Sequence, residues 1–398
     1  MPDESKANGS SIAAATRAEH ELLLLLCARS GGEELSRRVS ELVSVGGLDW
    51  EYFLSLAQRH AIVPLVQRGL EAHARGLAPE PVRKSLRERY RANAARNVLL
   101  AGELLRVSGL FESEGIGVLA YKGPALAVAG YGDLSLRRFV DLDVIVRERD
   151  LARASKLLRG LGYAPQGLTR EQEAALARTQ HNIAYTRDGG RLTVELHRDV
   201  ASKDFADVTL DEGAWSRASS VPLLGGTVAT LSAEDLLLAL CVHGTKHLWE
   251  RLAWVCDVAG LINSHAELDW RAVFERARAA HVERMLLLAL ALAQTLAAAS
   301  LPEEVRRSVE EDEAVARLSS EAAARMFDGA EYRPAGLFRS VGFNLRARSR
   351  ARERLRYFRF ILTPTDGDLT ALALPARLSF IYYLLRPLRL LLKRPEGH

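Results

Sequence analysis

Cysteine and aromatic residues are scarce in this chain. Its 398 residues include three cysteines, Cys27, Cys241 and Cys256, whose scattered positions fit neither a disulfide framework nor a thiolate metal site. Aromatic residues make up only 7% of the chain, while hydrophobic residues as a whole make up 48%, as in an ordinary globular protein. The scarcity of cysteine excludes a disulfide-stabilised secreted scaffold and favours a reducing, cytoplasmic location.

The chain also has little excess of charge of either sign. Its 54 basic and 50 acidic side chains leave a formal net charge of +4, and both signs are interspersed along most of the sequence. A protein that follows a nucleic-acid backbone carries a basic groove or stripe, because phosphate neutralisation supplies most of its affinity. The charge balance therefore does not support nucleic acid as a partner.

No uninterrupted apolar run is long enough to cross a bilayer. Leu22–Leu26 is five residues long, whereas a spanning helix needs about 20. Leu372–Leu392 is largely apolar but contains Arg377, Arg386 and Arg389, which argue against a transmembrane helix. A basic amphipathic helix of this kind suits either peripheral membrane contact or packing on the core or on a partner, and the pattern favours packing.

Changes in hydrophobic periodicity divide the chain into four parts. Residues 1–17 are polar and are predicted to be disordered, and 18–110 show helical periodicity. Residues 111–230 mix strand and helix signals, and 231–398 are again helical. These patterns predict an α+β fold: a small core with a mixed sheet, flanked by N-terminal and C-terminal helical regions.

Capping residues, prolines and glycines give the expected limits of several helices and strands. Asp49 is a candidate N-cap, and Pro64 interrupts the helix that Asp49 begins. Pro81 opens a long helix, and Ser232 begins another. Strands are expected at 116–121 and 141–146, a hairpin at 182–197 around Arg187-Asp-Gly-Gly190, and a short β segment near 221–229, with helices at 124–130 and 150–161 between them.

The second of these strands carries two carboxylates two residues apart. Alternate residues of a strand share a face, so Asp141 and Asp143 point one way and Leu142, Val144 and Val146 point into a core. Adjacent carboxylates repel each other and are costly to desolvate, and a divalent cation is the usual compensation.

Three motifs in order resemble the uncharacterised nucleotidyltransferase family, within the nucleotidyltransferase superfamily that has a DNA polymerase β-like fold. They are Tyr121-Lys-Gly-Pro-Ala-Leu126, then Leu136-Arg-Arg-Phe-Val-Asp-Leu-Asp-Val-Ile-Val146, then Val194-Glu-Leu-His197. The resemblance covers roughly residues 20–300 and is concentrated in 118–200. Minimal nucleotidyltransferases carry Gly-Ser where this chain has Gly123-Pro124, which weakens the wider analogy more than the family assignment.

The resemblance implies a Mg²⁺-dependent (or Mn²⁺-dependent) enzyme that transfers NMP from an NTP such as ATP to an acceptor hydroxyl and releases pyrophosphate. It implies that Asp141, Asp143 and Glu195 hold the metal and act in catalysis. It further implies that Lys122, Gly123 and Arg137 contact the nucleotide phosphates. The acceptor is not identified by these motifs, because one such site serves many acceptors.

Other readings of these residues stay open. The chain could be a catalytically silent relative that binds nucleotide or serves as a scaffold, or a toxin-like transferase that acts on tRNA or protein. Arg137 has an alternative role as an ion-pair partner of Asp133 or Asp141, and His197 as a group that orients Glu195. His243 and His247 have a spacing that suits zinc, but no third ligand is evident, so core packing is the favoured reading.

Overall fold

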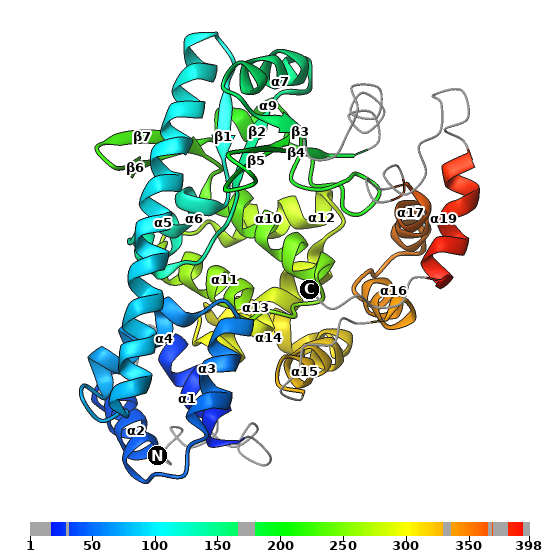
Figure 1. The fold of residues 1–398 in the computed structure, drawn as a ribbon. Coiled ribbons are helices and arrows are strands. Elements are labelled where there is room, and N and C mark those ends of the chain that lie inside the picture. The colour runs from blue at the N-terminus through cyan, green and yellow to red at the C-terminus, as the bar shows by residue number, and fades with distance from the viewer. Residues whose placement is uncertain are drawn as a thin grey trace.

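The computed structural model of the chain describes residues 17–28, 32–165, 180–328, 336–364, 368 and 381–392. A small sheet lies among helices contributed by both ends of the chain, which confirms the predicted α+β class (Figure 1). Apart from Arg17, the segment predicted to be disordered lies outside the described residues. The domain limits expected at residues 110 and 230 stay a prediction.

Five helices precede the sheet. They are α1 (Ala18–Cys27), α2 (Gly32–Ser44), α3 (Trp50–Arg59), α4 (Val63–His73) and α5 (Glu80–Ser113). As predicted, Asp49 caps α3, because its side chain accepts a hydrogen bond of 2.9 Å from the Tyr52 backbone N–H. Pro64 and Pro81 each lie in the first turn of a helix, where the missing N–H costs no hydrogen bond. The 34-residue α5 runs from the N-terminal helices along the whole height of the sheet (Figure 1).

The central sheet has five strands in the order β1-β2-β5-β4-β3. They are β1 (Val118–Ala120), β2 (Leu142–Val146), β3 (Ala164–Pro165), β4 (Asn182–Arg187) and β5 (Leu192–His197). β2 and β5 run parallel, and the other neighbouring pairs are antiparallel. The predicted hairpin is confirmed as β4–β5, and Asp188, Gly189 and Gly190 of its turn have positive φ, as such a tight reversal requires.

The two faces of this sheet have different surroundings. Leu142, Val144 and Val146 point, as predicted, into a core shared with the second half of α5 and with α7 (Leu151–Gly160). Ile145, on the opposite face of β2, belongs to the larger core formed by the remaining helices. Asp143 shares that second face, which is turned away from α5.

Short elements connect the strands to each other and to the next helical region. They are α6 (Gly123–Tyr131), the 3₁₀ turns η2 (Leu134–Leu136) and η3 (Glu148–Asp150), α9 (Glu212–Ser216), and the separate hairpin of β6 (Ser219–Leu223) and β7 (Gly226–Thr230). The last of these confirms the β segment predicted near 221–229. Ser232 then caps the next helix by accepting a hydrogen bond from the Asp235 backbone N–H.

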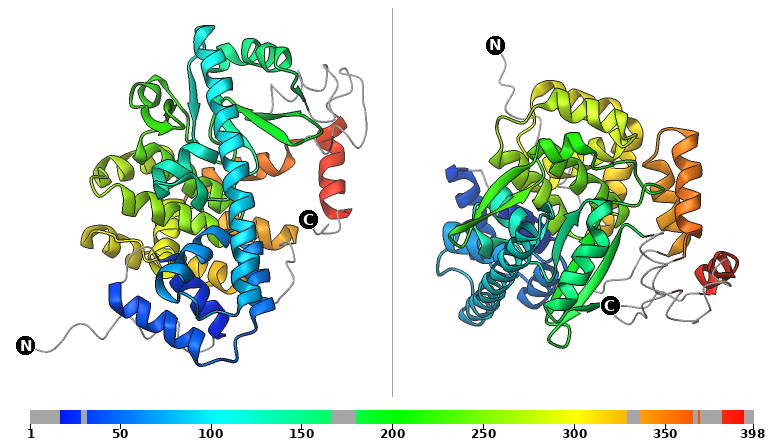
Figure 2. Two further views of the ribbon diagram at one scale, coloured as in Figure 1. Left: turned by 60° about the vertical axis from the view of Figure 1, so that its left-hand side comes forward. Right: turned by 90° about the horizontal axis from the view of Figure 1, so that it is seen from above.

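The rest of the described chain is helical. Its helices are α10 (Ala233–Lys246), α11 (Leu252–Ser264), α12 (Trp270–Ala279), α13 (Glu283–Ala297), α14 (Glu303–Glu311), α15 (Glu313–Met326), α16 (Leu337–Arg346), α17 (Ala351–Leu362) and α19 (Ile381–Leu392). Figure 2 shows α16, α17 and α19 along one side of the molecule, away from α5. The first part of the predicted C-terminal apolar segment, including Arg377, lies outside the described residues.

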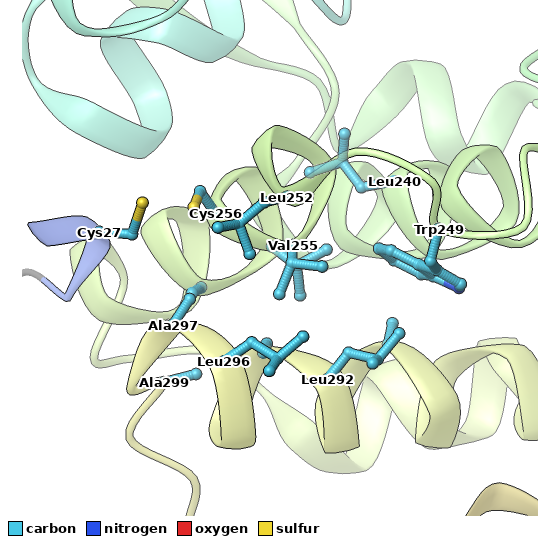
Figure 3. Close-up of a cluster of buried hydrophobic side chains, with 14 of the residues drawn as sticks. Cys27, Leu240, Trp249, Leu252, Val255, Cys256, Leu292, Leu296, Ala297 and Ala299 are labelled. Carbon is cyan, nitrogen blue, oxygen red and sulfur yellow. The ribbon is translucent and has the colours of Figure 1, made fainter. Parts of the chain in front are cut away.

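The largest core lies where α11 crosses α13. Leu252 and Val255 of α11 face Leu292 and Leu296 of α13 (Figure 3). The three cysteines are free and buried, so they act as small apolar core groups. Within the part of the chain that the structure describes, no helix is both long and apolar enough to cross a membrane.

Candidate functional site

The parallel pairing of β2 with β5 brings two of the predicted carboxylates together. Asp143 lies directly opposite Glu195 in the register of these strands, and Ile145 lies opposite His197. Side chains at paired positions of neighbouring strands lie about 5 Å apart on the same face of a sheet. Asp143, Glu195 and His197 thus form a compact group, and among the described residues it is the one whose ligand atoms are close enough to share a single metal ion.

Asp143 is almost fully buried. Lys122 Nζ lies 2.7 Å from Asp143 Oδ1, and His197 Nε2 lies 3.2 Å from the same oxygen. Burial alone raises the pKa of Asp143, but Lys122 and His197 outweigh it and hold the pKa below its usual range. Burial likewise opposes the charge of Lys122, and the facing carboxylate raises its pKa overall. Both groups are therefore charged at neutral pH.

Glu195 is held in place from two sides. The Asn182 side-chain amide donates a hydrogen bond of 2.8 Å to Glu195 Oε2, and His197 Nε2 lies 3.2 Å from that oxygen. Burial works against ionisation of Glu195, but the contact with His197 lowers its pKa overall. The two carboxylates on either side of the His197 ring raise its pKa despite its burial. Sequence reasoning missed Asn182, although its position at the start of a strand paired with the Glu195 strand is a usable signal.

Asp141 lies just before β2 and is half-buried. Its burial and the nearby charges of Asp143 and Glu195 raise its pKa to about 6, because a third negative charge is costly beside the other two. That coupling places all three predicted carboxylates in one electrostatic group. Their summed negative charge exceeds the charge that Lys122 and His197 supply, so the site has room for an added cation.

Gly123 opens α6 beside the backbone of Asp141. Its φ is +53°, and a Cβ at this position would lie 3.2 Å from the Asp141 carbonyl oxygen. The left-handed conformation and the close approach both require glycine here. The N-terminus of α6 therefore starts next to the strand that carries the carboxylates, with the first N–H groups of the helix free of intrahelical partners.

Arg137 is held by a carboxylate distant in sequence. Its Nε and Nη2 donate to the two carboxylate oxygens of Asp257, each over 2.9 Å, and the Tyr131 hydroxyl donates to the same carboxylate over 2.8 Å. Asp133, one of the two partners expected from the sequence, instead accepts a hydrogen bond from Ser135. The structural role predicted as the alternative is thus present, but with Asp257 of α11 as partner. A carboxylate inside the apolar run 255–261 is a signal that could have found it.

His243 of α10 and His247, which directly follows the helix, lie side by side and pack against Trp254. Their ring centroids are 4.7 Å apart, and each lies within 5.4 Å of the Trp254 ring. Burial lowers the pKa of both imidazoles, to about 3 for His247. No further histidine, cysteine or carboxylate joins them in the described chain to complete a metal site, which agrees with the packing role favoured above.

A cavity of about 760 Å³ lies on the far side of His181 from the carboxylate group, and none of the three carboxylates lines it. His181, whose ring centroid lies 5.8 Å from that of His197, forms part of its wall. The cavity lies beyond the carboxyl ends of β2 and β5, where 147–149 and 198–204 line it. Its volume lies within the range of clefts that accept small-molecule ligands.

The fold and the site together define an α+β protein with two paired carboxylates and a histidine on one face of a mixed sheet. A family model described as "Uncharacterised nucleotidyltransferase" matches residues 46–298, which is more than half of the chain and includes every site residue discussed above. The chain therefore belongs to the uncharacterised nucleotidyltransferase family, as its three motifs predict. No curated protein and no solved structure matches it.

Proposed function

We propose that the protein transfers NMP from an NTP, ATP being the first to test, to an acceptor hydroxyl in a Mg²⁺-dependent reaction that releases pyrophosphate. The observation that carries the proposal is the register that sets Asp143 opposite Glu195, with Asp141 close enough to feel both charges. Family membership supports nucleotidyl transfer as the reaction class.

The donor set fits a hard divalent ion. Asp143 is buried, and a metal ion would take the place that Lys122 Nζ holds beside its Oδ1. Magnesium binds carboxylate oxygens together with substrate phosphates and water, and manganese suits the same ligands. Asp141, Asp143 and Glu195 would hold the metal, which when bound neutralises phosphate charge and activates the attacking hydroxyl.

The chain's own residues would position the nucleotide. Lys122 carries a charge that stays ionised despite burial, and its flexible stem lets the ammonium move from Asp143 to a phosphate oxygen. Gly123 has no side chain to block phosphate from the first turn of α6. Arg137 has its guanidinium held in a fixed orientation by the two hydrogen bonds to Asp257, and a phosphate oxygen would contact a nitrogen that these bonds leave over.

Glu195 is the carboxylate proposed to lie beside the acceptor. Its side chain is 27% exposed, compared with 3% for Asp143, so it borders the open side of the site. Asn182 and His197 both contact Oε2, which fixes the carboxylate and leaves Oε1 to face a substrate. A carboxylate held ionised in this way can accept the proton that the acceptor hydroxyl loses.

A titration with ATP and Mg²⁺ and an assay of pyrophosphate release test the proposal. Wild-type protein should bind MgATP, and Asp143→Asn should reduce binding at least tenfold, because a neutral amide is a poor ligand for magnesium. Asp188→Asn is a matched control: it removes one carboxylate in the β4–β5 turn, where asparagine tolerates the positive φ. Equal MgATP binding by Asp143→Asn and Asp188→Asn would contradict the metal assignment.

A catalytically silent relative is the second candidate, and the Lys122–Asp143 ion pair favours it. If the ammonium stays on Asp143, the carboxylate is not available to a metal. Incubation of the protein with labelled NTPs and cell extract separates the candidates. Labelling of a molecule together with pyrophosphate release supports the enzyme, and nucleotide binding without pyrophosphate release for any NTP supports the silent relative.

A further inference from the structure

A second group of cationic side chains lies outside the carboxylate group. It lines a pocket of about 370 Å³ formed by the α3–α4 junction, one stripe of α5 and residues 138–140. Arg89 and Arg96 are seven residues apart on α5, which places them two turns apart on the same stripe. Arg138 adds a third guanidinium from the segment that leads into β2.

These three arginines carry unneutralised charge. Among the residues that the structure describes, no aspartate or glutamate lines the pocket. Arg89 Nη1 donates to the neutral Gln58 Oε1 over 2.9 Å, and Arg96 Nη2 donates to the Val140 carbonyl over 3.3 Å. Neither these two nor Arg138 forms an ion pair with any described residue. Neutral oxygens thus orient the side chains without cancelling their charge.

The larger cavity beside His181 gives a direct contrast. There, Arg147 donates two hydrogen bonds of 2.8 Å to Glu212, and Arg359 pairs with Asp204. An anion that enters that cavity must compete with carboxylates already in place. No carboxylate of the described chain competes in this way in the smaller pocket.

Arg138 lies near two other guanidinium groups, those of Arg251 and Arg96. Partial burial and the neighbouring charges of Arg251 and Arg96 together lower the pKa of its guanidinium. Like charges held close together cost free energy, and a bound anion would remove that cost.

We infer that Arg89, Arg96 and Arg138 form a binding pocket for a phosphate group. Guanidinium groups match phosphate oxygens in a two-pronged geometry, which distinguishes them from a lysine point charge. The volume suits a phosphorylated small molecule. Arg138 is three positions before Asp141, so their Cα atoms lie at most about 11 Å apart. The pocket and the carboxylate group flank the same short segment, 138–141, and the idea that one substrate contacts both rests on the proposed function, whereas phosphate binding itself does not.

Calorimetric titration of the full chain with inorganic phosphate, without divalent metal, tests the pocket. The double variant Arg96→Gln/Arg138→Gln should bind phosphate at least tenfold more weakly, because two charge-assisted contacts are lost. Arg91→Gln is the matched control, an exposed arginine of α5 that does not line the pocket. The control should bind like wild type, and unchanged unfolding temperatures show that all variants fold.

The inference is overturned if wild-type protein does not bind phosphate, or if the double variant and wild type bind it equally. A supporting result leaves two sources for the phosphate, and competition separates them. If MgATP displaces phosphate, the pocket takes a phosphate of the nucleotide; if both bind together, it takes one carried by the acceptor. Asp143→Asn should keep phosphate binding, so a failure of the proposed metal site leaves this result intact.

Discussion

Lys122 and Asp143 form a buried ion pair in which Nζ lies 2.7 Å from Oδ1. The pair joins the start of α6 to β2 and fills one coordination position of the proposed metal site. The same ammonium is also the nearest candidate for a phosphate contact. The two roles exclude each other at any one moment, because one Nζ cannot hold Asp143 and follow a phosphate at the same time.

Lys122→Gln separates these roles. Without the ammonium, a metal ion no longer competes with Lys122 for Asp143. Mn²⁺ should therefore bind the protein severalfold more tightly in the absence of nucleotide. Nucleotide affinity should fall roughly tenfold or more, because a charged contact to phosphate is lost. Calorimetric titration with Mn²⁺ and then with nucleotide measures both. Weaker Mn²⁺ binding by the variant would show that Lys122 supports the metal site and does not compete with it.

Metal affinity should depend on pH through Asp141. Its pKa is raised to about 6, so the metal-free fold favours the protonated form of this group below that pH and gains stability from it as the pH falls. Metal requires the ionised form, and affinity for Mn²⁺ should therefore drop about tenfold per pH unit below pH 6. Titrations between pH 5 and pH 8 measure the slope. Asp141→Asn should bind more weakly at pH 7 and show a shallower slope; an unchanged slope would assign the titration to another group.

Removing one partner of the Arg137–Asp257 ion pair should strongly lower the free energy of unfolding. Asp257→Asn leaves a guanidinium that is 12% exposed without its counter-charge, and such a loss typically costs about 3–5 kcal/mol. The double variant Arg137→Met/Asp257→Leu removes both charges and should recover much of that free energy of unfolding. Urea unfolding of the two variants and wild type measures the coupling. If the double variant were no more stable than Asp257→Asn, removing both charges would not restore stability. The pair would then have a role beyond balancing its two charges.

Local elements of this fold follow from the sequence, because their causes are local. The alternation of Leu142, Val144 and Val146 with Asp141 and Asp143 predicts both the strand and its two faces, and the Gly-rich turn predicts the β4–β5 hairpin. The same alternation predicts that Asp141 and Asp143 share one face of the strand. Each of these signals lies within about ten residues.

Contacts between distant segments do not follow in this way. The sequence contains Asp143 and Glu195, but only the parallel register of β2 and β5 places them opposite each other. Arg137 and Asp257 are 120 residues apart, and their pairing depends on how α11 packs against α6. Such contacts depend on how whole helices and strands are placed relative to one another. The packing of the apolar cores determines that placement, and no single residue predicts it.

His60 should make stability depend on pH in the acidic range. It is fully buried; Leu252 N–H donates to its Nδ1, so Nε2 carries the proton and faces the Met326 carbonyl at 3.1 Å. Burial, with a smaller contribution from Arg59, lowers the pKa of His60 to about 3. The unfolded chain takes up a proton near pH 6.5 and the folded chain does not. Stability from this group is therefore present above pH 6.5 and declines by about 1.4 kcal/mol per pH unit as pH falls toward 3.

The variant His60→Gln isolates this contribution, because glutamine keeps one donor and one acceptor but does not titrate. Urea unfolding at pH 7, 6 and 5 should show a smaller loss of stability in the variant than in wild type over the same interval. Carboxylates elsewhere titrate equally in both proteins, so the difference between the two slopes reports His60 alone. Identical slopes would mean that the buried ring takes up a proton without unfolding.

Gly244 should tolerate no side chain. A Cβ at this position would lie 2.4–2.5 Å from ring carbons of Trp249, which is fully buried and holds a positive φ of 55°. Because both the ring and its backbone are confined, Gly244→Ala should force a shift in the core and cost about 1–3 kcal/mol. Gly109→Ala on α5 is the matched control: nothing lies within 4 Å of its added Cβ, so helix propensity should raise stability by about 0.5–1 kcal/mol. Urea unfolding followed by tryptophan fluorescence measures both, and a Gly244→Ala protein as stable as wild type would show that Trp249 can move freely.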